Sequence, residues 1–289
     1  MSTAAALVVV RPGPLTTVQD LGRVGVAHLG VPRAGALDPP AHRAANRLVG
    51  NAAGAATLET TLGGITVRAE GGPVLAAVTG APCAVRLDGR PAAWGRAVLV
   101  PAGSALEVGP AEAGVRAYLA VRGGIAVPPV LGSRSADLLA GLGPAPLRAG
   151  DRLPVGAEHG APAAELAPLA APPAELVLRL RPGPRADWFA PDTFALLPRH
   201  RYRVAAASNR IALRTEGPAL TRAVPGELES EGMVLGAVQV PPDGRPVLFL
   251  ADHPTTGGYP VIGVVPAADL PAAAQARPGT PVRFSPLRA

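Results

Sequence analysis

The sequence predicts a mainly β protein with a few short helices, organised as two β domains. Short runs of Val and Leu recur along the chain and are separated by turn-forming residues, 35 Gly and 35 Pro, as is typical of many short strands joined by turns. Hydrophobic residues make up 48% of the chain but aromatic residues only 3%, so Val, Leu and Ala must build the core. Similar strings recur in the two halves, which favours two related domains over one.

The domain boundaries are predicted from an Ala- and Pro-rich stretch in the middle of the chain. Residues 154–175 show no strand or helix period and are interpreted as a linker. The strand-and-turn string Leu7–Pro14 before this stretch returns as Leu176–Pro184 after it. We therefore expect a first β domain over 1–153 and a second over 176–289.

Three helices are expected between the strands. The clearest covers 38–49, where Asp38 can cap the N-terminus and two prolines fit the first turn. A second covers 269–276 with Asp269 as its cap, and a short one lies around 192–197. Runs of Val, Leu and Ile predict strands at 7–10, 65–68, 74–79, 97–100, 115–121, 176–180, 233–240, 247–250, 259–265 and 281–284.

The composition excludes several kinds of chemistry. The formal net charge is +6, and all 27 basic residues are Arg. Without lysine the chain has no Walker A lysine, no Schiff base and no site for biotin attachment, so ATP or biotin chemistry would be shared with another polypeptide. The Arg residues are scattered and not interleaved with aromatic residues, so no nucleic-acid partner is expected.

The cysteine, histidine and apolar patterns set further limits. The single cysteine, Cys83, excludes an intramolecular disulfide and is expected to be a small buried hydrophobe. The five His have no ligand spacing, so no metal is expected. No apolar run reaches the roughly 18 residues of a membrane span, and the first residues lack a basic signal region. We therefore expect a cytoplasmic protein with no membrane partner.

Two polar segments of the first half are candidates for a site. In Thr16–Asp38, Arg23 offers a guanidinium fork suited to a carboxylate, and Asp20 is placed to accept a substrate N–H. The alternative is an internal Asp20–Arg23 ion pair that braces an irregular loop. In Leu131–Gly143, Ser135 is expected to cap a short helical turn.

The third candidate is a loop that interrupts a strand, Ala251–Val265. It is longer than a tight hairpin needs, and its Asp252 and His253 are suited to proton transfer. The alternative is a solvated hairpin with glycine at positive φ. The loop also offers hydroxyl groups, an open backbone and a ring for stacking, on Thr255, Thr256, Gly257, Gly258 and Tyr259.

Several longer motifs occur in one order between about Val10 and Phe284. The motifs are TTVQDLGRVGVAHLGVPRAGALD, ANRLVGN, RGGI, LGSRSADLLAGLG, SNRIALRTEGPAL, SEGMVLGAVQVPPDGRP and ADHPTTGGYPVIGVV. Together they resemble the biotin-dependent carboxyltransferase-related family, also called allophanate hydrolase subunit 2-like, which includes a 5-oxoprolinase subunit and part of urea carboxylase.

The resemblance implies two cyclophilin-like β-barrel domains and a non-autonomous enzyme subunit. The expected activity is that of a component like the C subunit of ATP-dependent 5-oxoprolinase, which converts 5-oxo-L-proline and water to L-glutamate. A protein like the B subunit of that enzyme would complete the carboxyltransferase-like unit, and a third subunit would take part in lactam opening. ATP is expected at the level of the complex.

A lactam substrate needs an acceptor for its N–H, a donor for its oxygen and a cation for its carboxylate. Asp20 or Asp252 is the expected acceptor, and Arg23 or Arg210 the expected cation. The candidate catalytic residues are Asp20, Arg23, Asp252 and His253, and the candidate substrate-binding residues are Arg210, Glu231, Thr255, Thr256, Gly257, Gly258 and Tyr259.

Two other functions compete with this one. A regulatory protein without chemistry would bind a kinase-inhibitor-like partner. A prolyl isomerase would follow from the barrel fold, but that activity relies on an aromatic-lined pocket and the chain has only four Phe.

Overall fold

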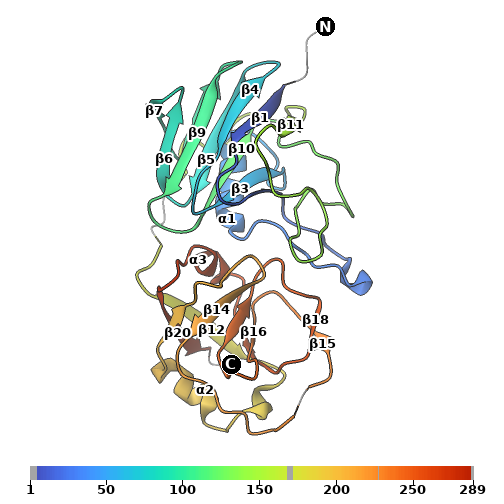
Figure 1. The fold of residues 1–289 in the computed structure, drawn as a ribbon, viewed down its shortest axis with the longest axis vertical. Helices are drawn as coiled ribbons and strands as arrows, with labels where there is room; N and C mark the ends of the chain where they lie inside the picture. The colour runs from blue at the N-terminus through green and yellow to red at the C-terminus, as the bar shows by residue number, and fades with distance from the viewer. Residues whose placement is uncertain (1–4, 168–171, 227, 288–289) are drawn as a thin grey trace. The chain divides into compact units, whose positions relative to one another are not determined.

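The computed structural model describes residues 5–167, 172–226 and 228–287, and the chain divides into two compact units (Figure 1). The first unit holds Met1–Arg23, Ala34–Asp137 and Gly141–Pro172. The second holds Val24–Arg33, Leu138–Ala140 and Pro173–Ala289. The boundary at 172 therefore lies inside the segment expected as a linker.

The first unit is built from two antiparallel sheets (Figure 1). The six-stranded sheet runs in the order β11 (Arg152–Pro154), β1 (Ala6–Arg11), β4 (Thr66–Glu70), β9 (Ala105–Ala111), β6 (Cys83–Leu87) and β7 (Arg90–Ala92). The five-stranded sheet runs in the order β2 (Thr16–Gln19), β3 (Thr57–Thr61), β10 (Arg116–Val121), β5 (Val74–Gly80) and β8 (Ala97–Val100).

One apolar core joins these sheets. It contains Leu7 and Val67 from the first sheet and Leu58 and Leu119 from the second, all at most 1% exposed. Val, Leu and Ala side chains supply this core, as the composition predicts, because alternate residues of each strand face inward. Cys83 is 7% exposed, and burial raises the pKa of its thiol to about 11, which confirms it as a buried apolar residue.

Helix α1 (Pro39–Leu48) packs on the outer face of the five-stranded sheet. Its Ala45 and Leu48 lie in a second apolar cluster with Tyr118 and Ala120 of β10. Every residue of β10 is therefore buried, because its alternate side chains face two different cores. A polar chain anchors the start of the helix: the Asp38 N–H donates to the Tyr118 hydroxyl, which donates to the Glu59 carboxylate, both at 2.8 Å.

Asp38 caps α1 as predicted, since its Oδ1 accepts the Ala41 N–H at 3.1 Å. Replacing Asp38 with Ala is expected to lower the free energy of unfolding of the first unit by about 1 kcal/mol. Urea denaturation followed by the fluorescence of Trp94, in the first unit, measures this. Asp38→Asn keeps an acceptor and is the control; equal losses in the two variants would contradict capping.

The segment expected as a linker is hydrogen-bonded to the rest of the first unit at several of its described residues. The Ala163 N–H donates to the Arg47 carbonyl at the end of α1, at 3.0 Å, and the Ala167 N–H donates to the Gly95 carbonyl at 2.9 Å. Arg122 donates to the Gly160 carbonyl at 2.8 Å. The Ala and Pro side chains of segment 154–175 give no strand or helix period. Its irregular backbone can still donate hydrogen bonds to neighbouring carbonyls.

The second unit is a closed barrel of seven strands (Figure 1). Their order is β12 (Leu176–Pro182), β19 (Val261–Val264), β16 (Ala237–Gln239), β17 (Val247–Phe249), β14 (Ala212–Glu216), β13 (Tyr202–Val204) and β20 (Pro281–Pro286), and β12 and β20 pair in parallel. A separate ribbon joins β15 (Glu231–Gly232) to β18 (Thr256–Gly257).

The expected strand at 233–240 is wrong over its first part, because the structure has a strand only at Ala237–Gln239. The preceding residues follow the two-residue ribbon strand β15 instead. The Met233 N–H donates to the Thr255 carbonyl at 2.8 Å, which continues the ribbon pairing.

The remaining helices are short. α2 (Thr193–Leu196) and α3 (Leu270–Ala274) lie where the sequence predicts them. The expected cap by Asp269 is wrong: its side chain makes no capping bond and instead accepts from the Arg179 side chain and backbone N–H, the latter at 2.9 Å. A charged donor outcompetes a neutral helix N–H for this carboxylate. The described part of the chain also forms 3₁₀ helices, namely η1 (Ala27–Leu29), η2 (Ala186–Trp188) and η3 (Leu197–Arg199).

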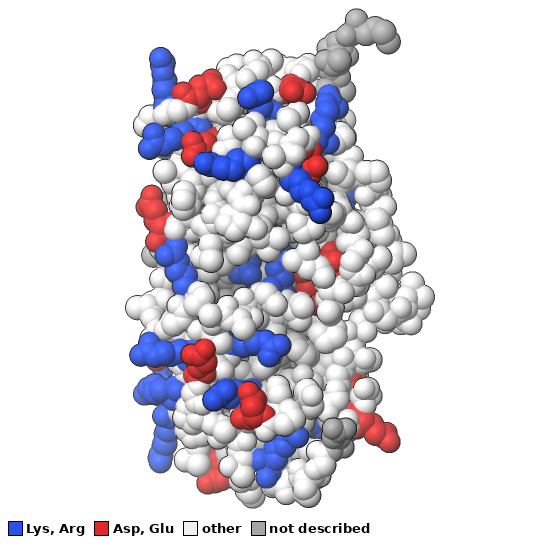
Figure 2. Space-filling model, in the orientation of Figure 1, with Lys and Arg blue, Asp and Glu red and all other residues white. Residues whose placement is uncertain are grey.

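The predicted mainly β class with a few short helices is thus confirmed. The strands pair as two sheets in the first unit and close into a barrel in the second. Among the described residues, every helix is too short or too polar to cross a lipid bilayer. On the face displayed in Figure 2, basic side chains alternate with acidic ones and with broad uncharged areas.

Candidate functional site

A buried ion pair lies where two paired strands of the barrel meet their loops. β14 and β17 pair antiparallel with Ala212 opposite Phe249, so the residues just before β14 and just after β17 come together. These residues are Arg210 and Asp252, whose backbones bond at 3.1 Å. Their side chains meet in a bidentate pair, with both N–O distances 2.9 Å and side-chain exposures of 1% and 0%.

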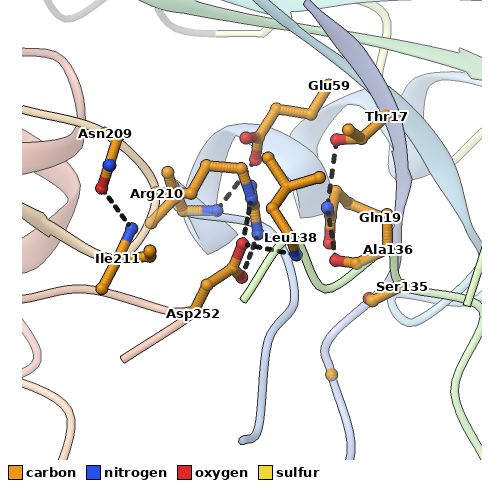
Figure 3. A network of polar contacts seen from close by, with 12 residues as sticks. Thr17, Gln19, Glu59, Ser135, Ala136, Leu138, Asn209, Arg210, Ile211 and Asp252 are labelled. Carbon is orange, nitrogen blue, oxygen red and sulfur yellow. Dashed lines mark hydrogen bonds and ion pairs between the residues drawn. The ribbon is translucent and has the colours of Figure 1, made fainter. Parts of the chain in front are cut away.

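The Asp252 carboxylate has a further donor besides Arg210. The Leu138 N–H donates to Asp252 Oδ2 at 3.5 Å, and Figure 3 shows it beside the two guanidinium contacts. Asn209 Oδ1 accepts the Ile211 N–H at 2.8 Å, a local turn that fixes the backbone around Arg210 (Figure 3). The pair is therefore held rigidly, as buried charges must be. Sequence reasoning named both residues but not their pairing.

His253 follows Asp252 directly and is 6% exposed. Its Nδ1 donates to the Pro254 carbonyl at 2.7 Å, because a carbonyl oxygen can only accept. Its ring stacks on Phe249 with 5.9 Å between centroids and 14° between planes. In the neutral ring this tautomer makes Nε2 the basic nitrogen.

The loop after His253 forms the β15–β18 ribbon. Thr256 and Tyr259 are exposed, whereas Gly257 and Gly258 are partly covered. A side chain at Gly257 would come within 2.8 Å of the Gln239 amide nitrogen, so close packing against Gln239 accounts for that glycine. The Gln239 amide nitrogen also donates to the Tyr259 carbonyl at 3.0 Å. Thr255 is half-buried, and its carbonyl belongs to the ribbon pairing.

Two arginines that sequence reasoning missed flank this ribbon. Arg185 binds both carboxylate oxygens of Glu231. The Arg222 guanidinium lies 5.9 Å from the centroid of the Tyr259 ring. No spacing pattern signals these contacts, because the paired residues are 46 and 37 positions apart. Glu231, expected as a substrate-binding residue, has its carboxylate engaged by Arg185.

In the first unit, Asp20 is the centre of a hydrogen-bonded loop cluster. Its Oδ1 accepts from the hydroxyls of Ser133 and Ser135, both at 2.6 Å, and from the Gly22 N–H at 2.8 Å. Its Oδ2 accepts the Arg134 N–H at 2.6 Å. Burial raises the pKa of Asp20, but these hydrogen bonds outweigh it and leave the pKa below its ordinary value. Asp20 is a fixed anion that organises the 133–135 loop.

The expected capping of a helical turn by Ser135 is wrong. No helix follows in the described residues 136–143, and the Ser135 hydroxyl bonds to Asp20 instead, donating to its carboxylate and accepting its backbone N–H at 2.9 Å. The Asp20 N–H occupies the acceptor position of the hydroxyl that a cap would use, and only the tertiary fold brings Asp20 near.

Arg23 does not pair with Asp20, so the alternative of an internal ion pair is also wrong. Its guanidinium donates to the carbonyls of Ser135, at 2.5 Å, and Val130, at 3.1 Å. Gln19 extends the same connection by donating to the Ala136 carbonyl at 3.0 Å (Figure 3). Asp20 and Arg23 thus both hold the loop at 130–136 in place. Within the described residues, no three His, Cys, Asp or Glu side chains gather as a metal site.

Known proteins resemble this chain over nearly its whole length. The chain is 40% identical to the C subunit of 5-oxoprolinase from Escherichia coli K12 over 286 residues, covering 96% of this chain and 90% of that protein. It is 34% identical to urea amidolyase of Lachancea kluyveri, covering 98% of this chain but 17% of that protein.

Solved structures agree with these relatives. The protein TTHA0988 superposes with a TM-score of 0.87 at 40% identity, covering 99% of this chain and 57% of that one. The urea amidolyase of K. lactis superposes with a TM-score of 0.91 at 30% identity, covering 100% of this chain and 19% of that one. Residues 29–286 match the family described as carboxyltransferase domain, subdomain A and B. The chain therefore belongs to the carboxyltransferase domain family.

Proposed function

We propose that the chain is a component like the C subunit of an ATP-dependent 5-oxoprolinase, which converts 5-oxo-L-proline, ATP and water to L-glutamate. The observation that carries the proposal is the 40% identity to the E. coli C subunit across 90% of that protein. A partner like the B subunit and a third, lactam-cleaving subunit complete the enzyme. In TTHA0988 and the urea amidolyases the matching region is part of a longer chain, which suits a domain that works beside others.

The second unit supplies the residues best suited to a lactam. Asp252 holds a buried carboxylate paired with Arg210, and each carboxylate oxygen can accept more than one hydrogen bond, which suits it to an amide N–H. His253 has its Nδ1 proton fixed on a carbonyl, so its Nε2 can take or return a proton. Asp20 and Arg23 are engaged with backbone and serine groups, so they serve as positioning residues in this proposal. Biotin would have to be carried by another chain, because this one has no lysine.

The test is to express the chain with its two partner subunits and follow glutamate release from 5-oxoproline and ATP. Turnover should require all three polypeptides. Full turnover without this chain would reject the proposal. Tight binding to a partner with no glutamate release under any condition would instead favour the regulatory alternative.

Replacing His253 with Asn tests its role in that complex. The Asn amide can still donate to the Pro254 carbonyl, so the loop should keep its geometry while the Nε2 atom is lost. We expect kcat to fall about 100-fold. His200→Asn is the matched control, since His200 is a partly buried second-unit residue whose Nδ1 contacts the Tyr202 hydroxyl at 3.3 Å. Equal activity of the His253 variant and wild type would remove His253 from the mechanism.

A further inference from the structure

Arg222 is a half-buried cation of the second unit with no carboxylate beside it among the described residues. One guanidinium nitrogen donates to the Val240 carbonyl at 2.6 Å, and the Tyr259 ring lies alongside. Its Nε is buried and has no acceptor among the described residues. A guanidinium removed from water normally has an anion to compensate it. Arg222 is therefore a candidate for binding an anion from outside the chain.

Arg185 and Arg222 border the same stretch of backbone. The Arg185 N–H donates to the Val261 carbonyl at 3.3 Å. The Val240 that accepts from Arg222 donates its own N–H to Pro260 at 3.0 Å. The Arg185 side chain binds Glu231, which pairs with Gly257, and the Arg222 side chain lies beside the Tyr259 ring. Two cationic side chains therefore border residues 257–261.

Glu231 shows what kind of group Arg185 binds. Both its carboxylate oxygens bind the Arg185 guanidinium, the bidentate geometry that Arg forms with carboxylates. The pair is partly exposed, at 35% and 28% for the two side chains, so it adds little stability by itself. An incoming carboxylate can therefore compete with Glu231 for this position.

We propose that Arg222 and Arg185, next to Tyr259 and the β15–β18 ribbon, form a binding site for a small organic carboxylate, with Glu231 as an internal competitor. The inference deepens the proposed function, on which the choice of ligand rests, since 5-oxoproline carries a single carboxylate. Arg222 binds this carboxylate directly, and Arg185 joins when it leaves Glu231. The two arginines that sequence reasoning favoured for this role, Arg23 and Arg210, are both buried and engaged elsewhere.

Trp188 provides a local signal for binding. The Ala223 N–H donates to the Trp188 carbonyl at 2.8 Å, and Phe189 and Arg222 form a β-bridge, so this tryptophan belongs to the same corner of the unit. Replacing Trp94 with Phe leaves Trp188 as the one tryptophan of the chain. The full chain is titrated with 5-oxoproline and with 2-pyrrolidinone, the same ring without a carboxylate. The titrations are repeated in a Glu227→Gln background. This removes the carboxylate of residue 227, which lies outside the described residues, as a competitor for Arg222.

The site predicts opposite effects for two substitutions. Arg222→Gln should weaken binding of 5-oxoproline about tenfold or more, because a charge-assisted contact is lost. Glu231→Gln should strengthen it by up to about fivefold, because Arg185 is released from an exposed pair. Arg245→Gln, at an exposed arginine near Asp243, is the matched control and should bind like wild type. 2-Pyrrolidinone should not bind measurably.

Several outcomes would overturn the site: equal binding of 2-pyrrolidinone, unchanged affinity in Arg222→Gln, or weaker affinity in Glu231→Gln. Acetate, titrated in parallel, separates this inference from the proposed function. Arg222-dependent binding of acetate in a chain whose complex never turns over 5-oxoproline would keep the carboxylate site and reject the 5-oxoprolinase assignment. Turnover of 5-oxoproline with an unchanged KM in Arg222→Gln would keep the 5-oxoprolinase assignment and reject the carboxylate site.

Discussion

Replacing Asp252 with Asn is expected to lower the free energy of unfolding of the second unit by about 3–5 kcal/mol. The substitution removes the carboxylate that neutralises Arg210, whose side chain is 1% exposed. A buried guanidinium that loses an anionic partner also loses interaction energy that offset its desolvation, which is why breaking such a pair is far more harmful than breaking a surface pair. Urea denaturation followed by Trp188 fluorescence, in the Trp94→Phe background, measures the change in the second unit.

Two further variants make this expectation specific to the buried pair. Glu175→Gln breaks the partly exposed pair with Arg283, at 3.4 Å, and should cost less than about 1 kcal/mol. The double variant Arg210→Met, Asp252→Leu should lose clearly less than the sum of its two single losses, because neither charge is left behind. Additive losses would show that the two side chains contribute independently.

Replacing Asp20 with Asn is expected to cost the first unit about 3–5 kcal/mol. One carboxylate oxygen becomes an NH₂ group that faces hydrogen-bond donors, either the Arg134 N–H or the hydroxyls of Ser133 and Ser135. The remaining bonds change from charge-assisted to neutral. Trp94 fluorescence in the Trp188→Phe background measures the loss. Asp88→Asn is the control. Asp88 is exposed and accepts the Ala105 N–H, so its replacement should shift the urea midpoint of the first unit little.

The stabilisation from Asp20 should depend on pH in a defined direction. Its pKa is lower in the folded chain, so its contribution is fully present above the ordinary carboxyl pKa of about 4. It is lost as pH falls through the lowered folded pKa. The difference between wild type and Asp20→Asn should therefore narrow in acid. A constant difference down to about pH 2 would contradict this role.

Local sequence signals predicted the elements but not the choice of partners. Asp38 and Asp269 both precede a helix with proline in its first turn. Asp38 caps its helix, whereas Asp269 bonds to Arg179, which is 90 residues away along the chain. Competition from a distant cation is invisible in the local pattern, so the same signal gave one correct prediction and one wrong prediction.

The candidate site shows the same division. The sequence identified Asp252, His253 and the loop after them because acid, imidazole and glycine occur together. It did not reveal that Asp20 binds residues more than 110 positions away, or that Arg222 lies beside Tyr259. The ribbon strands are two residues long, too short to carry any period. Which charges meet across the barrel depends on strand register, which a single sequence does not specify.

The parallel pairing of β12 with β20 has a consequence for synthesis. β12 is the first strand of the barrel to be translated and β20 the last, so the ring of hydrogen bonds cannot close until residue 286 has left the ribosome. Until then β12 and β13 each lack a neighbour, and these open edges can pair wrongly with other nascent chains. The first unit completes its six-stranded sheet once β11 has emerged, so it can fold earlier and independently of that delay.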